Sequence, residues 1–133
     1  MYLMSTKLYF MRVLVVDDDN LHLLILRKIF EKSQDTVVVA HNGIEAIEEL
    51  RKDPNFNVIL TDIMMPEMDG LELLGKIKGD LKTQGIPVIG FTAGDVEYYR
   101  RKSLIPFDIL VPKPMDFWDL HQLAKKKALT DLN

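Results

Sequence analysis

Cysteine is absent from this chain of 133 residues, which excludes disulfide bonds and thiolate metal sites within it. A reducing compartment suits that composition, and we expect a cytoplasmic protein. No apolar run approaches the roughly 20 residues that a membrane-spanning helix needs, so we expect no membrane partner. An excess of basic charge is also missing. The 17 basic and 20 acidic residues give a net charge of −3, and nothing in that balance favours direct binding of nucleic acid.

The residues that are present suit one folded domain. Hydrophobic residues make up 47% of the chain and charged residues 28%, which is enough apolar surface for a core and too little charge for disorder. We interpret residues 1–9 as a short N-terminal extension and residues 10–130 as a single domain.

Short apolar runs alternate with segments that have the period of a helix. The segments expected as strands are 10–16, 37–40, 57–62, 88–92 and 107–111. The segments expected as helices are 21–32, 43–51, 71–81, 95–104 and 115–129. Asn20 is the expected cap of the first helix. Strict alternation predicts an α/β fold in which helices cover both faces of a parallel sheet.

Polar side chains stand where the expected strands end. They are Asp17, Asp18 and Asp19 after the first strand, Asp62 at the end of the third, Thr92 at the end of the fourth and Lys113 after the fifth. In a parallel sheet all these ends lie at the same edge, which is where open α/β sheets bind their ligands. The sequence therefore predicts one crevice that holds carboxylates, a hydroxyl and an ammonium group.

Several carboxylates packed together repel one another unless a cation is present. Lys113 supplies one positive charge and a divalent ion would supply the rest. The three histidines, His22, His41 and His121, fall on helix or loop positions, so the expected ligands are all oxygen atoms. Such a site favours Mg²⁺ or Mn²⁺ over Zn²⁺. A carboxylate such as Asp62 beside that ion is arranged to attack a phosphoryl group and form an aspartyl phosphate.

Four motifs in this order carry a resemblance to a known family. They are Val15-Val16-Asp17-Asp18, Leu60 to Gly70, Phe91-Thr92-Ala93 and Pro112-Lys113-Pro114. Together they resemble the receiver domain of two-component response regulators, of the chemotaxis-regulator type. The resemblance implies a flavodoxin-like (βα)5 fold, doubly wound, with a parallel five-stranded sheet in the order 2-1-3-4-5.

The resemblance also implies a role for each polar side chain at the strand ends. Asp62 would be the phosphoacceptor, and Lys113 and Thr92 would contact the phosphoryl group. Asp62, Asp18, Asp17 and Met64 would hold the cation. Asp18 would bind the Mg²⁺ (or Mn²⁺) directly, Asp17 through water and Met64 through its main-chain carbonyl.

The implied function is a signalling switch that catalyses its own phosphorylation and dephosphorylation, and not a metabolic enzyme. A histidine kinase or phosphotransfer protein would donate the phosphoryl group, and a downstream protein that the sequence does not identify would read the result. Residues 95–104, 107–111 and 115–129 would form the partner surface, and the same surface would serve a homodimer. The family usually has an aromatic residue three positions before Lys113, where this chain has Leu110.

Two other interpretations stay open on the sequence. A haloacid-dehalogenase-like phosphatase would use Asp17 and Asp19 as its first motif and Thr92 and Lys113 as later ones, but it leaves Asp62 without a role. A degenerate receiver would bind partners without being phosphorylated. In a true receiver, Gly94 would leave the phosphoryl group open to water while Met64 would shield it, so the sequence predicts no clear lifetime.

Overall fold

The computed structural model describes residues 9–113 and 116–130, and it contains five strands and five helices in strict alternation. The elements are β1 (Arg12–Val16), α2 (Asn20–Lys32), β2 (Thr36–Ala40), α3 (Gly43–Lys52), β3 (Val58–Asp62), α4 (Gly70–Lys78), β4 (Val88–Thr92), α5 (Val96–Lys102), β5 (Ile109–Pro112) and α6 (Phe117–Thr130). Residues 1–8 of the expected extension, Pro114 of the last motif and Met115 lie outside the described residues.

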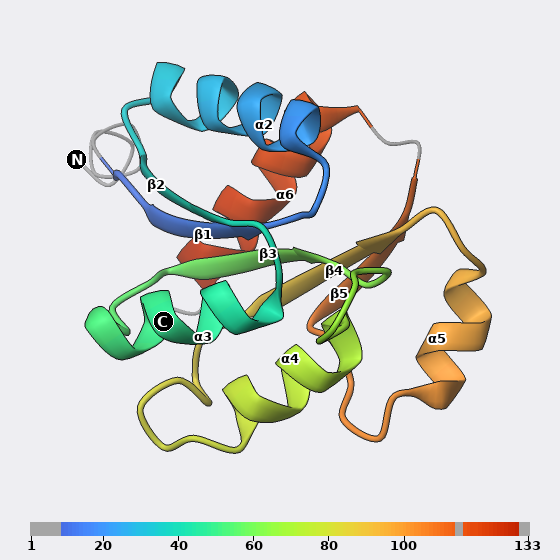
Figure 1. The fold of residues 1–133 in the computed structure, drawn as a ribbon. Helices are drawn as coiled ribbons and strands as arrows, with labels where there is room; N and C mark the ends of the chain where they lie inside the picture. The colour runs from blue at the N-terminus through green and yellow to red at the C-terminus, as the bar shows by residue number, and fades with distance from the viewer. Residues whose placement is uncertain (1–8, 114–115, 131–133) are drawn as a thin grey trace.

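The sheet is parallel throughout and its strand order is β2-β1-β3-β4-β5, which confirms the predicted fold class and order. Figure 1 shows α2 and α6 on one face of the sheet and α3 and α4 on the other, while α5 lies beyond the end of β4, beside β5. Within the described part of the chain, no helix is both long enough and apolar enough to cross a lipid bilayer.

Two apolar layers form because successive residues of a buried strand point to opposite faces of the sheet. In β1, Val13 and Val15 belong to the layer under α2 and α6, which also contains Phe30. Leu14 and Val16 belong to the layer under α3 and α4. β3 and β4 are buried along their whole length. Continuous apolar runs are the expected sequence of strands covered on both faces, which is why the strands were predictable.

Several predicted boundaries are too generous. β5 begins at Ile109 and not at residue 107, and α5 spans Val96–Lys102 and not 95–104. β1 begins at Arg12 because Phe10 is 49% exposed and the Met11 amide donates to the side chain of Asp35. α4 ends at Lys78, before the expected Leu81. Gly79 occupies its C-cap, as is common for a residue with low helix propensity.

The predicted cap of the first helix is wrong. Asn20 is the first residue of α2, and the cap is Asp19. The Oδ1 atom of Asp19 accepts from the amides of Leu21 at 2.9 Å and His22 at 3.2 Å. A carboxylate is favoured at this place because the free amides and the helix dipole both stabilise negative charge there. The third residue of the aspartate run therefore starts the helix.

Candidate functional site

The acidic side chains meet at the carboxyl edge of the sheet, where the strand order reverses between β1 and β3. Val16 is paired with Thr61 in the register of these two strands. The residues that follow Val16 and Thr61 are Asp17 and Asp62, so the parallel pairing of the two strands places them side by side. The amide of Asp17 donates to the carbonyl of Ala40 in β2, which fixes the start of the loop.

Three carboxylates converge at this edge. Asp17, Asp18 and Asp62 each offer one oxygen, and the three oxygens all lie within 4.8 Å of one another. Asp17 is fully buried, Asp62 is 5% exposed and Asp18 is exposed to solvent. A set of hard oxygen ligands that opens to water on one side fits a cation such as Mg²⁺, which keeps part of its hydration shell.

Burial raises the pKa of Asp62 from 3.8 to about 6, and the neighbouring charge of Asp17 pushes it in the same direction. The ammonium group of Lys113 and the amide of Met64 act against this rise in pKa. Ionised Asp62 therefore costs free energy in this site when no cation is bound. A divalent ion would remove much of that cost.

Lys113 reaches the carboxylates from the end of β5. Its Nζ atom lies 3.2 Å from Oδ2 of Asp62 and 3.5 Å from Oδ2 of Asp17. The amide of Lys113 donates to the carbonyl of Thr92 at 2.7 Å, so the main chain continues the ladder between β4 and β5 up to the lysine. The structure therefore brings together Asp17, Asp62 and Lys113, as the sequence suggested.

Thr92 and Met64 flank the same edge. Thr92 is fully buried, and its hydroxyl oxygen accepts from the amide of Gly94 at 3.0 Å. The amide of Met64 donates to Oδ1 of Asp62 at 3.3 Å, while the Met64 side chain is 53% exposed. Met64 thus holds Asp62 through its main chain and leaves its thioether at the mouth of the site.

The loop after Asp62 closes tightly onto the end of β3. The amide of Gly70 donates to the carbonyl of Ile63 at 2.8 Å. A Cβ atom at Gly70 would lie 2.6 Å from the carbonyl oxygen of Asp62 and 2.7 Å from Cα of Ile63. Both neighbours are main-chain atoms that cannot rotate away, so only glycine allows this approach.

We therefore predict that Gly70→Ala will destabilise the fold by about 2–4 kcal/mol, because the methyl group overpacks against the main chain of the site. Urea denaturation measures the loss. Gly75→Ala is the matched control in the same helix, since nothing lies within 4 Å of its added methyl group. That control should gain about 0.5–1 kcal/mol from helix propensity. Equal effects of the two substitutions would contradict the close approach at Gly70.

His22 is a residue of the site that the sequence did not reveal. Its Nδ1 atom lies 3.1 Å from Oδ2 of Asp17 and 3.4 Å from Nζ of Lys113. His22 lies in a helix, as the sequence indicated, but its ring still reaches the carboxylates at the strand ends. α2 begins directly after the aspartates, so its first turn stands over the site and turns this ring back toward Asp17. The signal in the sequence was the position of His22 only three residues after the capping residue Asp19.

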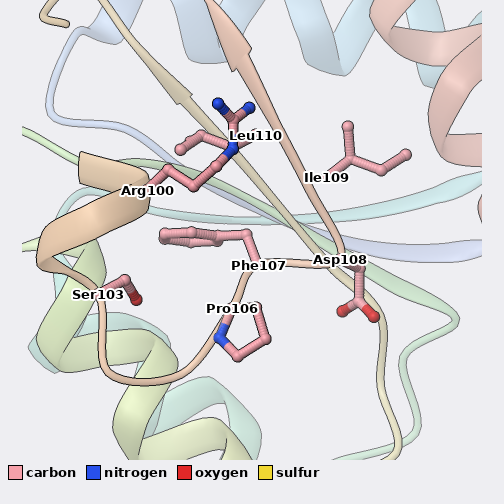
Figure 2. A pocket seen from close by; sticks show the side chains of 7 residues that line it. All are labelled: Arg100, Ser103, Pro106, Phe107, Asp108, Ile109 and Leu110. Carbon is pink, nitrogen blue, oxygen red and sulfur yellow. The ribbon is translucent and has the colours of Figure 1, made fainter. Parts of the chain in front are cut away.

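The neighbourhood of Leu110 contains a pocket of about 380 Å³ between α5 and β5 (Figure 2). Its lining residues are Arg100, Ser103, Pro106, Phe107, Asp108, Ile109 and Leu110. Figure 2 shows the Phe107 side chain turned toward α5. A Cβ atom at Gly90 would lie 2.8 Å from the Phe107 ring and 3.0 Å from Leu110. Leu110 has no aromatic ring, but the neighbouring Phe107 supplies one that lies over β4.

Comparisons with known proteins agree with this geometry. The family model of the response regulator receiver domain matches residues 13–125. The two-component response regulator ORR5 of Oryza sativa subsp. japonica is 38% identical over 84 residues, and this match covers 63% of each protein. A chemotaxis protein CheY homolog of Campylobacter jejuni is 37% identical over 83 residues, covering 62% of this chain and 64% of that protein. These matches thus span less than two thirds of either relative.

Solved structures extend the likeness over most of the chain. A CheY-like response regulator receiver domain protein from Methanospirillum hungatei is 28% identical, with a TM-score of 0.80 over 93% of this chain and 98% of that one. A CheY4 structure from Vibrio cholerae superposes with a TM-score of 0.81 at 22% identity, which supports the fold alone.

Proposed function

Since the chain belongs to the response regulator receiver domain family, we propose that Asp62 accepts a phosphoryl group and thereby switches the protein between two signalling states. Receiver domains are the signalling switches of two-component systems. The observation that carries the proposal is the position of Asp62, which is buried among two further aspartates and lies 3.2 Å from the ammonium group of Lys113. The comparisons give no support to a dehalogenase-like phosphatase, which would leave Asp62 unused.

In the proposed reaction an oxygen of Asp62 attacks the phosphorus atom, and the bond from phosphorus to the donor breaks as the donor leaves with its electron pair. Lys113 is placed to hold an oxygen of the phosphoryl group, because its Nζ atom already faces Asp62. Thr92 would donate its hydroxyl to another oxygen. Charge on the transferring group develops mainly on these oxygens, so positioned donors stabilise the transition state.

The cation site belongs to the same proposal. Asp18 would bind Mg²⁺ or Mn²⁺ directly, Asp17 through a water molecule, and Met64 through its main-chain carbonyl. Asp62 would be a further ligand. When bound, the ion neutralises charge on the carboxylates and on the phosphoryl group.

The proposed partners are a histidine kinase or phosphotransfer protein as donor and a downstream protein that reads the phosphorylated state. The receiver unit would comprise residues 10–130, and its surface formed by α5, β5 and α6 would bind the downstream protein or a second copy of the chain. We also place the protein in the cytoplasm, where donors phosphorylated from ATP work. Self-phosphorylation and slow self-dephosphorylation would be its only chemical activities.

Incubation of the purified protein with Mg²⁺ and acetyl phosphate tests the proposal. Intact mass spectrometry should show a gain of one phosphoryl group, and removal of Mg²⁺ with EDTA should prevent it. Sustained turnover of p-nitrophenyl phosphate should be absent. A protein that gains no phosphoryl group from any small donor would instead be a degenerate receiver.

A further inference from the structure

Gly94 leaves an empty position beside Thr92, and a residue from α5 fills it. A Cβ atom built on Gly94 would lie 2.9 Å from Cε2 of Tyr99. The same point is 3.4 Å from the hydroxyl oxygen of Thr92 and 3.5 Å from Sδ of Met64. The ring of Tyr99, the thioether of Met64 and the hydroxyl of Thr92 therefore converge where residue 94 has no side chain.

The position of Tyr99 is fixed by the start of α5. The Asp95 side chain accepts from the amides of Glu97 at 2.9 Å and Tyr98 at 3.3 Å, which caps the helix. The amide of Tyr99 donates to the carbonyl of Asp95 at 3.2 Å. The rings of Tyr98 and Tyr99 then meet edge to face at 5.1 Å. Tyr98 is 52% exposed, whereas Tyr99 is half-buried because its ring turns toward the site.

Met64 reaches the same point from the other side. Its amide donates to Oδ1 of Asp62, so its main chain stands directly beside the proposed phosphoacceptor. Asp62 is paired with Phe91 in the sheet, and Thr92 is the next residue of β4. The ring and the thioether thus lie at the ends of β3 and β4, close to the Thr92 hydroxyl that would contact a phosphoryl group on Asp62.

We propose that Tyr99 and Met64 form an apolar lid that shields the aspartyl phosphate from water. The inference rests on the proposed phosphorylation of Asp62. In hydrolysis, a water oxygen attacks phosphorus, the bond between phosphorus and the Asp62 oxygen breaks, and the carboxylate and inorganic phosphate are released while the water gives up its protons. Exclusion of the attacking water slows this step. Gly94 and Met64 therefore do not oppose each other, because the ring of Tyr99 takes the place of the missing side chain.

The lifetime of the phosphorylated protein tests the lid. The protein is phosphorylated with acetyl phosphate, the donor is removed, and decay is followed by intact mass and by released inorganic phosphate. Tyr99→Ala should speed decay by about three- to tenfold, because water then reaches the phosphoryl group. Tyr99→Phe should keep the wild-type rate, since the ring and not the hydroxyl shields. Arg101→Ala, at an exposed position of the same helix, is the control and should also keep the wild-type rate.

Gly94→Ala gives a second test, which asks whether Gly94 and Tyr99 act through the same contact. The added methyl group would meet the Tyr99 ring at 2.9 Å and displace it, so decay should quicken in the wild-type background. With Tyr99→Ala already present, Gly94→Ala should add no further acceleration. Such non-additivity is the mark of two residues that act through one contact.

The outcomes separate the lid from the function on which it rests. No phosphoryl gain in the wild-type protein would overturn both. Phosphoryl gain with equal decay in the wild type and Tyr99→Ala would overturn the lid alone. Slower decay in Tyr99→Phe would mean that the phenol assists the attacking water, which is the reverse of shielding.

Discussion

Asp62→Asn should abolish phosphoryl incorporation from acetyl phosphate, with a fall in rate of about three orders of magnitude or more. The amide that replaces the carboxylate has no charge and is a very poor nucleophile. Lys113 and the remaining two aspartates stay in place, so the loss would fall on the chemical step. Intact mass spectrometry of the variant with Mg²⁺ and donor measures it. Asp119→Asn, at an exposed position in α6, should be phosphorylated as the wild type is.

The stability of Asp62→Asn tests whether loss of activity could come from unfolding of the variant. Burial raises the pKa of Asp62 from 3.8 to about 6 in the folded protein. The folded state therefore favours the protonated carboxyl group, and this favourable contribution is complete below pH 3.8 and is lost as the pH rises through about 6. In metal-free buffer above pH 6, Asp62→Asn should raise the free energy of unfolding. An inactive variant that is also less stable there would contradict this account of the site.

Mg²⁺ should stabilise the wild-type protein and should fail to stabilise Asp18→Asn at the same concentration. An ion that binds only the folded state adds about 2.7 kcal/mol when its concentration is about 100 times its Kd. Asp18 is the exposed member of the three-carboxylate cluster and the proposed direct ligand. Loss of its charge should weaken Mg²⁺ binding by at least about tenfold. Thermal unfolding across a series of MgCl₂ concentrations, with titration calorimetry, measures both quantities.

Asp19→Asn is the matched control for Asp18→Asn. It removes one negative charge from the adjacent residue, while asparagine remains a good helix cap. Asp19 is not part of the cluster of carboxylates that converge within 4.8 Å. Its Mg²⁺ affinity should therefore stay close to that of the wild type. An equal loss in the two variants would show that the ion responds to the general negative field, and not to a specific ligand.

The alternation of strands and helices could be predicted from the sequence, and so could the edge of the sheet where the polar side chains meet. Both follow from local patterns. The buried run from Val58 to Leu60 is a strand wherever it is placed, and Asp62 must then stand at the edge. The choice between Asp19 and Asn20 as helix cap was harder, since either residue is a good cap and only the turn after β1 decides. Gly79 ended α4 early, although the apolar spacing continues to Leu81.

The contacts of His22 and Tyr99 could not be predicted in the same way. Each lies on a helix whose own period gives no reason to connect it with Asp17 or Thr92. His22 meets the site because α2 starts at once after β1, and Tyr99 because Gly94 leaves room for its ring. Such contacts depend on how elements pack, and a pattern within one segment does not contain that information.

The last strand of the sheet also has a consequence for assembly. β5 is only four residues long and ends at Pro112. The amide of Lys113 points to β4, so the alternation along the strand turns the position of Pro112 toward the open side, where a proline offers no hydrogen. A neighbouring chain that tried to extend the sheet would find one donor missing there. Strand addition along the backbone is therefore disfavoured on this side, and we expect a protein that docks there to recognise side chains.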